Sequence, residues 1–387
     1  MRRSSDASQA SIERFVSWVQ TKALPFWAET GLCPDGGVVE RLDLNGYPER
    51  PGFKRVRVHA RQAYVFSHAH VMGLPGMYAP AQQAISFLLA HGRDDQGGWV
   101  VKMGERGGIV DPDLDLYDQA FVILALVWWA KASHDPRAIA TARETLAMIK
   151  NRFARHDGKG FLSRCPDNGF ALQNPHMHLL EALLALHAVD PDGPARAVCA
   201  QLLTLFRNTL FDAQSGTIGE TFDLNWAPVG GAAGQIIEPG HHFEWYWLLY
   251  MAGQAGFETG AEQAAQLFNF AERHGVRADT GLIHDTLDRT GAVSSHAHRS
   301  WPQTERIKAS VAHDARTGTD SRARIAMAID TLHRFYLDPA PVPGTWLDHV
   351  DSTGTPIVQS VPASTLYHLF LAHAELVRAM TPLSEKA

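Results

Sequence analysis

The sequence has few features that would place the protein in a membrane, in an oxidising compartment or on nucleic acid. Its three cysteines, Cys33, Cys165 and Cys199, are scattered and form no C-x-x-C pair, which is typical of a reducing compartment and predicts a cytoplasmic location. The longest apolar run, 120–130, is too short to cross a bilayer, and the first ten residues contain no apolar segment of a secretory signal. The net charge of −6 includes no basic run, so we expect neither a nucleic acid nor a membrane partner.

The sequence also lacks the usual motif of a helical metal site. It has 20 histidines but no H-E-x-x-H motif. Its three H-x-H pairs, which begin at His68, His176 and His296, space the side chains two residues apart, and residues at that spacing do not share a helix face. We therefore expect no bound metal and no other cofactor, with a Zn²⁺ or Mn²⁺ enzyme as the alternative.

The chain is organised as a repeat. Each unit contains a helix, a long glycine-containing loop and a second, more apolar helix. The expected helices cover 9–30, 55–72, 80–91, 115–132, 136–153, 176–189, 194–210, a segment from 238, 260–274, a segment from 300, 320–337 and 361–380. The second helices begin 60 to 62 residues apart, near Arg55, Asp115, His176, Glu238, Ser300 and Val361. Six such units account for twelve helices.

The contrast between the two kinds of helix predicts the fold. The second helices are apolar nearly all round, as in 121–129 and 179–186, whereas the first helices contain more Arg, Glu, Asp and Gln. This difference suits six inner helices ringed by six outer ones. We predict an all-α fold, an (α/α)6 barrel of six helical hairpins in a single domain covering 1–387, with short β-hairpin-like loops at one mouth. An open α-solenoid is the alternative.

The predicted barrel places polar residues from the whole chain in one pocket. All six inner helices would run in the same direction, so their N-termini would meet at one mouth. The polar residues near those N-termini are Arg57, Arg61, Gln62, Asp115, Tyr117, Asp118, Asn174, His176, His178, His241, His242, Glu244, Trp301, Gln303, Glu305 and His368. We interpret this convergence as the functional site.

The segment 238–249 is the most informative part of that site. Pro239 and Gly240 are typical of a helix start, and His241 and Glu244 would then share a face. The positive end of the helix dipole would disfavour protonation of His241, which suits a neutral imidazole base. The alternative interpretation is a hydrogen-bonded polar cluster that ties a loop to the core.

Two kinds of chemistry fit these residues. Asp118, Glu244 and Glu305 could act as the paired carboxylates of an inverting glycosidase, but each has a basic or amide neighbour in the sequence pattern. Proton transfer by histidine fits better, with His241 and His368 facing each other across the barrel. A barrel that binds carbohydrate without catalysis is a further alternative.

In the histidine interpretation, the surrounding residues have defined roles. Arg61 would stabilise an enediolate oxygen, and Glu244 would orient His241 or hold a hydroxyl group. The indole of Trp301 offers a face for a sugar ring, although core packing is the ordinary role of any single aromatic residue.

Six motifs in this chain resemble those of the N-acylglucosamine 2-epimerase superfamily of sugar epimerases and isomerases. They are 60–67 (ARQAYVFS), 115–121 (DLYDQAF), 174–182 (NPHMHLLEA), 240–245 (GHHFEW), 301–309 (WPQTERIKA) and 362–369 (PASTLYHL). The resemblance implies a metal-independent (α/α)6 barrel in which His241 and His368 are the acid/base pair. It implies that the sugar site is lined by Arg61, Asn174, His178, Glu244, Trp301 and Glu305. From their position at the mouth we add Tyr117, Asp118, His176 and Gln303 as candidate sugar contacts.

Within the superfamily, the segment 344–351 (GTWLDHVD) followed by 362–364 most resembles bacterial D-mannose isomerases. This resemblance implies an aldose–ketose isomerase that interconverts D-mannose and D-fructose, and related sugars such as lyxose and xylulose, through a cis-enediol. His368 would carry the proton between C2 and C1, and His241 would assist ring opening and proton transfer at oxygen. The alternative is a 2-epimerase acting on mannose and glucose or on the N-acyl sugars.

The expected partner is a monosaccharide, and the expected assembly is a monomer or a homodimer. The segment 158–160 is too short to cradle a phosphate group as a glycine-rich loop. Lys54, Arg55 and Arg57 could still meet a phosphate or sulfonate, so the sequence leaves a charged sugar open.

Overall fold

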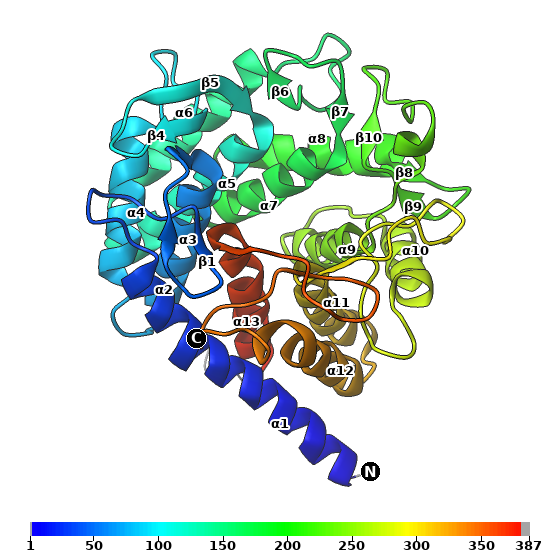
Figure 1. Cartoon of the computed structure of the whole chain (residues 1–387). Coiled ribbons are helices and arrows are strands. Elements are labelled where there is room, and N and C mark those ends of the chain that lie inside the picture. Colours follow the sequence, from blue (N-terminus) through cyan, green and yellow to red (C-terminus); the bar gives the residue numbers. More distant parts are fainter. Residues whose placement is uncertain (1, 381–387) are drawn as a thin grey trace.

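The protein forms a ring of helices around a central axis (Figure 1), as described by a computed structural model of residues 2–380. The inner helices are α3 (Val56–Val71), α5 (Leu116–Ser133), α7 (Gln173–Val189), α9 (Pro239–Gln254), α11 (Trp301–Thr317) and α13 (Leu366–Met380). The outer helices are α1 (Arg2–Trp18), α2 (Leu24–Thr30), α4 (Tyr78–His91), α6 (Pro136–Arg152), α8 (Ala195–Leu205), α10 (Ala261–Phe270) and α12 (Arg322–Leu332).

The ring of inner helices is closed. Each inner helix contacts the next one, and α13 returns to contact α3. In Figure 1 the red α13 accordingly lies between the blue α3 and the brown α11. The predicted (α/α)6 barrel is therefore confirmed, and the open solenoid is wrong.

Among the outer helices, each of the first five inner helices packs most closely against the one that follows it. The short connections after α3, α5, α7, α9 and α11 turn the chain back along the barrel into α4, α6, α8, α10 and α12. Side-chain caps support two of these helix starts, since Asp115 accepts a hydrogen bond from the Tyr117 amide and Asp135 from the Arg137 amide. The long loops from each outer helix to the next inner helix lie at the mouth.

Two inner helices begin at places different from those predicted. Helix α7 begins at Gln173, three residues before His176. Helix α13 begins at Leu366, because Ser360–Pro362 form a strand and Ala363–Thr365 form a 3-10 turn before it. The predicted period is therefore regular only on average.

Short strands line the rim of the mouth. They are β1 (Arg41–Asp43), β2 (Pro48–Glu49), β3 (Phe53–Arg55), β4 (Val100–Gly104), β5 (Ile109–Asp115), β6 (Arg164–Cys165), β7 (Ala171–Leu172), β8 (Phe211–Asp212), β9 (Thr217–Ile218), β10 (Thr221–Phe222), β11 (His298–Arg299), β12 (His349–Val350) and β13 (Ser360–Pro362). Their pairing joins each loop to the next around the ring: β3 with β4, β5 with β6, β7 with β10, β11 with β12 and β13 with β1. A bridge between Ile237 and Leu287 joins the remaining two loops.

The first turns of five inner helices also hold the preceding loops. Nε2 of His59, His176 and His242 accepts a hydrogen bond from the amides of Val38, Phe161 and Ile218, at 3.0, 3.0 and 3.1 Å. Gln119 bonds both the amide and the carbonyl of Trp99, and Gln303 donates to the carbonyl of Gly281. We call His59, Gln119, His176, His242 and Gln303 the loop ties.

Glycine is required beside two of these ties. Gly37 and Gly160 have positive φ angles of 70° and 65°. A Cβ atom at Gly37 would lie 2.5 Å from Nε2 of His59, and one at Gly160 would lie 2.8 Å from Nε2 of His176. The glycines of the predicted long loops therefore allow the backbone to approach the imidazole rings.

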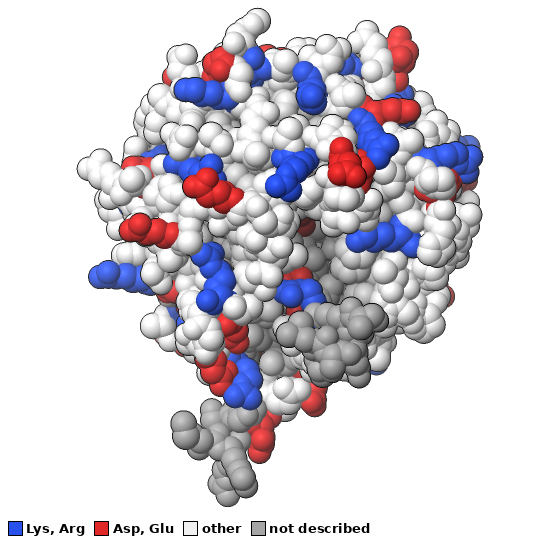
Figure 2. All heavy atoms as spheres, turned by 180° about the vertical axis from the view of Figure 1, so that it is seen from behind, with Lys and Arg blue, Asp and Glu red and all other residues white. Residues whose placement is uncertain are grey.

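The outer surface shows no charge pattern of one sign on the face opposite to that of Figure 1. Basic and acidic side chains are intermixed there (Figure 2). Within residues 2–380, no helix has the length and apolar character needed to cross a membrane.

Candidate active site

A cavity of about 240 Å³ lies at the mouth of the barrel, where the inner helices begin. Its lining consists of Arg61, Tyr117, Asn174, His178, Glu238, His241, Glu244, Arg299, Trp301, Asp348, Ser364, Thr365 and His368. These residues come from all six inner helices or from the segments that lead into them. A larger hollow of about 510 Å³ between α2 and the β1–β2 hairpin is lined by no histidine and lies outside this convergence.

His241 is surrounded by carboxylates. Its Nδ1 lies 2.9 Å from Oε2 of Glu220, in the segment between β9 and β10, and 3.7 Å from Oε2 of Glu238. Burial disfavours the charged imidazole, but the negative charges of Glu220 and Glu238 outweigh burial and raise the pKa of His241 to about 9. His241 is therefore a cation at neutral pH.

His368 is placed beside cations. Its Nδ1 lies 2.8 Å from Oε1 of Glu305, and the other oxygen of Glu305 lies 2.5 Å from Nζ of the fully buried Lys308. Burial, followed by the positive charges of Arg61 and Lys308, lowers the pKa of His368 well below its usual value. His368 is therefore neutral at neutral pH, in contrast to His241.

Trp301 lies between the two histidines. Its ring centroid is 5.1 Å from that of His241 and 5.4 Å from that of His368. The indole approaches the first turn of α9 so closely that a Cβ atom at Gly240 would lie 2.5 Å from it. Gly240 thus makes room for the indole beside His241.

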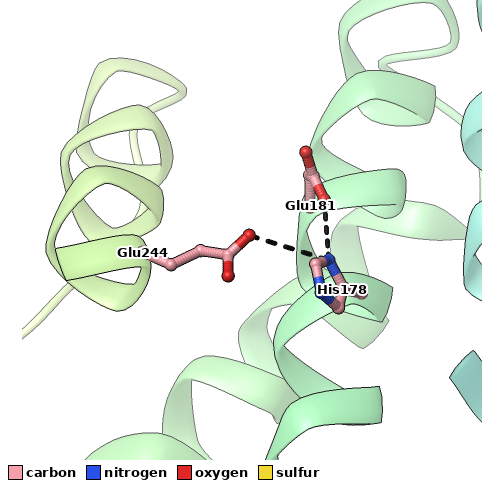
Figure 3. Close-up of side chains that lie close together, drawn as sticks. All are labelled: His178, Glu181 and Glu244. Atoms are coloured by element: carbon pink, nitrogen blue, oxygen red, sulfur yellow. Dashed lines mark hydrogen bonds and ion pairs between the residues drawn. The ribbon is translucent and has the colours of Figure 1, made fainter. Parts of the chain in front are cut away.

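Two further residues of the cavity lining, His178 and Glu244, face each other between α7 and α9 (Figure 3). On α7, Nδ1 of His178 lies 3.0 Å from Oε2 of Glu181, whose oxygens also accept a hydrogen bond from Tyr367. Glu244 on the neighbouring inner helix α9 points toward this pair, with Oε1 3.9 Å from Nδ1 of His178. Burial, followed by the charge of Glu305, raises the pKa of Glu244 well above its usual value.

The cavity offers free hydrogen-bonding atoms as well as paired charges. Within the described chain, neither oxygen of Glu244 nor Oδ1 of Asn174 has a hydrogen-bond partner. Arg61 donates to the Tyr117 hydroxyl and, at 3.3 Å, to the carbonyl of Ser364. Unpaired buried polar atoms are costly, so these groups are suited to binding the hydroxyl groups of a ligand.

The structure brings together most of the residues predicted to form the site, and it places four of them outside the cavity lining. Arg61, Tyr117, Asn174, His178, His241, Glu244, Trp301 and His368 all line the cavity. His176 and Gln303 do not, because both are loop ties. Asp118 is fully buried in an ion pair with Arg57 at 2.6 Å, and Glu305 lies behind His368.

Two expectations for His241 are also wrong. The helix dipole does not keep it neutral, because two nearby carboxylates outweigh that effect. Glu244 does not orient it, because Glu220 occupies that position.

Sequence analysis missed several residues that shape the site: Glu220, Glu238, Arg299 and Asp348. The spacing of Glu238 three residues before His241 was an available signal, since it places both on one helix face. No such signal exists for Glu220, which reaches His241 from a loop through the pairing of β7 with β10.

Three groups of residues in the described chain have ligand atoms close enough together to hold a metal ion. They are His178, Glu181 and Glu244; Glu220, Glu238 and His241; and Glu244, Glu305 and His368. None of these groups is an H-x-H pair from the sequence. Hydrogen bonds within them already link His178 to Glu181, His241 to Glu220 and His368 to Glu305.

Comparison with known proteins shows which family the chain resembles. The sequence model of the family N-acylglucosamine 2-epimerase (GlcNAc 2-epimerase) matches residues 36–372. A mannose-6-phosphate isomerase of Rhizobium meliloti (strain 1021) is 34% identical over 369 residues, covering 93% of this chain and 95% of the relative. A cellobiose 2-epimerase of Bacteroides fragilis is 24% identical over 309 residues, covering 74% and 78%.

A solved structure also shares the fold. The crystal structure of a D-mannose isomerase superposes with a TM-score of 0.84 at 18% identity, covering 97% of this chain and 99% of that one. With the family match extending over most of the chain, this protein belongs to the N-acylglucosamine 2-epimerase family of sugar isomerases and epimerases.

Proposed function

We propose that the protein is an aldose–ketose isomerase that interconverts D-mannose and D-fructose through a cis-enediol. The observation that supports this proposal most is the opposite charge of two histidines on either side of Trp301: a neutral His368 and a cationic His241. Each uses Nδ1 to bind a carboxylate, which leaves Nε2 for the sugar.

The proposed reaction needs only these two groups for proton transfer. Neutral His368 takes the proton from C2 of the open-chain aldose while His241 gives its proton to O1, which produces the cis-enediol. His241 then takes the proton from O2, and His368 returns its proton to C1, which produces the ketose. Arg61 stabilises negative charge that develops on the oxygens.

The same charges favour isomerisation over 2-epimerisation. Isomerisation returns both histidines to the protonation states in which they began. Epimerisation requires His241 to take its proton back from O1 and to give it to C2 on the opposite face, which leaves His368 charged and His241 neutral. Both of those states are the unfavourable ones in this cavity.

The size and charge of the cavity support an uncharged monosaccharide as the substrate. Its volume of about 240 Å³ lies below the roughly 300 to 1,000 Å³ of pockets for drug-sized ligands, which suits a small molecule such as a monosaccharide. Arg55 and Arg57 are paired with Glu40 and Asp118 at 2.6 Å each, and Lys54 donates to the carbonyl of Gly36, so these three cations already have partners. We therefore favour free mannose over mannose 6-phosphate, although one relative bears the phosphate in its name.

We further propose that catalysis is independent of metal and that the enzyme works in the cytoplasm as a monomer or homodimer. The three cysteines are unpaired, which suits a reducing compartment.

The test is NMR of D-mannose incubated with the purified protein in D₂O containing excess EDTA. We expect fructose to form despite the chelator, and deuterium at C1 of the fructose would report exchange of the transferred proton with solvent. Glucose deuterated at C2 would identify a 2-epimerase instead. Activity only with mannose 6-phosphate would contradict the preference for a free sugar, and loss of activity with EDTA would contradict metal independence.

A further inference from the structure

We infer that Glu220 and Glu238 are positioning residues that set the ratio of isomerisation to 2-epimerisation by holding the proton on His241. This inference rests on the proposed function, because it concerns the choice between two outcomes of one enediol reaction. It assigns a role to two carboxylates that do not themselves exchange protons with the sugar carbon.

The charged groups around His241 explain why its proton is retained. The groups that face it are Glu238 immediately before α9, Glu244 from α9, Glu220 from the segment between β9 and β10, His178 from α7, Arg299 from β11, Glu305 from α11 and His368 from α13. The hydrogen bond that Nδ1 of His241 donates to Glu220 is the shortest of these contacts, at 2.9 Å. Arg299 binds Glu238 at 2.9 Å, and so holds the second carboxylate in position.

The arrangement around His368 is the reverse. Glu305 bonds its Nδ1, but the charge of this carboxylate is shared with Lys308 at 2.5 Å. Arg61 contributes a second cation from α3. His241 therefore lies in a negatively charged part of the cavity, and His368 lies in a positively charged part.

This difference in surroundings affects isomerisation and 2-epimerisation differently. After one isomerisation, His368 is again neutral and His241 is again charged, as at the start of the reaction. One epimerisation moves a proton from His241, beside the carboxylates, to His368, beside the cations. That swapped state is disfavoured tenfold for every unit by which the two histidine pKa values differ.

Removal of one carboxylate charge should lower the pKa of His241 and so reduce the difference between the pKa values of the two histidines. In Glu220→Gln the amide keeps the shape of the side chain but removes the charge nearest to Nδ1 of His241. In Glu238→Gln the second charge is removed, while the shorter contact from Glu220 remains. Neither change alters the surroundings of His368.

The experiment is NMR of D-mannose in D₂O with the wild-type protein, Glu220→Gln and Glu238→Gln, with fructose and glucose measured in the same sample. We expect the ratio of C2-deuterated glucose to fructose to rise about tenfold in Glu220→Gln and less in Glu238→Gln. The alkaline limb of the kcat profile should also move to lower pH in both variants, because His241 would lose its proton sooner. A purely structural role of either carboxylate would change neither the product ratio nor that limb.

A matched control is Asp113→Asn, which removes a carboxylate paired with Arg164 at 2.8 Å outside the cavity lining. Its product ratio should equal that of the wild type. An unchanged ratio in both glutamate variants, or complete loss of both products in both folded variants, would overturn the inference. Failure of the wild-type protein to form fructose would instead overturn the proposed function. If Glu220→Gln does not fold, Glu238→Gln alone decides.

Discussion

Histidines at the start of the inner helices belong to two regions, the cavity lining and the loop ties, which lie within one helix turn of each other. His241 and His242 are neighbours in the sequence, yet the first lines the cavity and the second holds the amide of Ile218 at 3.1 Å. The pair His178 and His176 on α7 is divided in the same way. The partner decides the role: the cavity histidines bond carboxylates through Nδ1, whereas the loop ties bond the backbone.

A carboxylate partner does not by itself make a histidine a cation, since burial lowers the pKa of His178 to about 4 although its Nδ1 bonds Glu181. Burial lowers the pKa of His176 and His242 to about 4, and at His242 the charge of Glu220 acts against burial without outweighing it. His241 is equally buried, but the carboxylates of Glu220 and Glu238 reverse the effect. Burial alone therefore does not distinguish a catalytic histidine from a structural one, and four changes would test the distinction.

The largest effect should follow from removing a cavity histidine. We expect His368→Ala to lower kcat for mannose isomerisation by a hundredfold or more, because the base at C2 is lost. His176→Ala should keep kcat within about twofold when measured on folded protein at 25 °C. Full activity of His368→Ala would show that the assignment of the base is wrong.

The second prediction concerns pH. The loop-tie histidines have folded pKa values of about 3 for His59 and about 4 for His176 and His242, below the value of about 6.5 in the unfolded chain. As the pH falls below 6.5 the unfolded chain gains protons first, so the free energy of unfolding decreases until the pH reaches about 4. Each tie at pKa 4 should contribute roughly 3 kcal/mol to this loss.

Urea unfolding at pH 7 and at pH 4.5 would measure this effect, with His176→Gln as the variant that lacks one titrating tie. An equal loss of stability in the two proteins would contradict the prediction. For His241 the sign is opposite: its raised pKa gives stability that is present below pH 6.5 and is lost as the pH rises through about 9.

A smaller effect should follow from breaking one tie at neutral pH. His176→Ala leaves the buried amide of Phe161 without an acceptor, which should lower the free energy of unfolding by about 2 kcal/mol. Calorimetry at pH 7 would record a lower Tm. A Tm equal to that of the wild type would mean that the tie contributes little to stability.

The smallest effect should follow from exchanging one kind of tie for the other. His176→Gln should cost less than about 1 kcal/mol at pH 7, because Gln119 and Gln303 already fill the corresponding positions on α5 and α11. Denaturant unfolding would compare it with His176→Ala. Equal destabilisation by the two substitutions would show that glutamine cannot replace histidine at this position of the fold.

The helical repeat and the shared direction of the inner helices could be predicted from the sequence, because apolar periodicity and loop glycines recur along the chain. From these features the sequence predicts where the mouth lies and that His241, His368, Trp301 and Arg61 lie there. The rotation of each first turn could not be predicted, because a shift of one residue turns a side chain by about 100°. For this reason the sequence predicts sugar contacts at His176 and Gln303, whereas both side chains bond the preceding loops.

Contacts between loops were equally beyond the periodic pattern. Glu220 reaches His241 because the pairing of β10 with β7 fixes the segment that contains Glu220. Each of these two strands is only two residues long. Asp348 enters the cavity through the loop before α13, where it accepts hydrogen bonds from Thr365 and Ser300. Such positions depend on strand pairs too short to be recognised in a sequence.

The continuous pairing of the rim loops has a consequence for how the protein unfolds. An open array of repeats can fray from its terminal units, each of which has a single neighbour. Here every loop is joined to two others, and β13 pairs with β1 across the two ends of the chain. No unit can separate without breaking two interfaces, so the barrel should lose its structure in one cooperative transition.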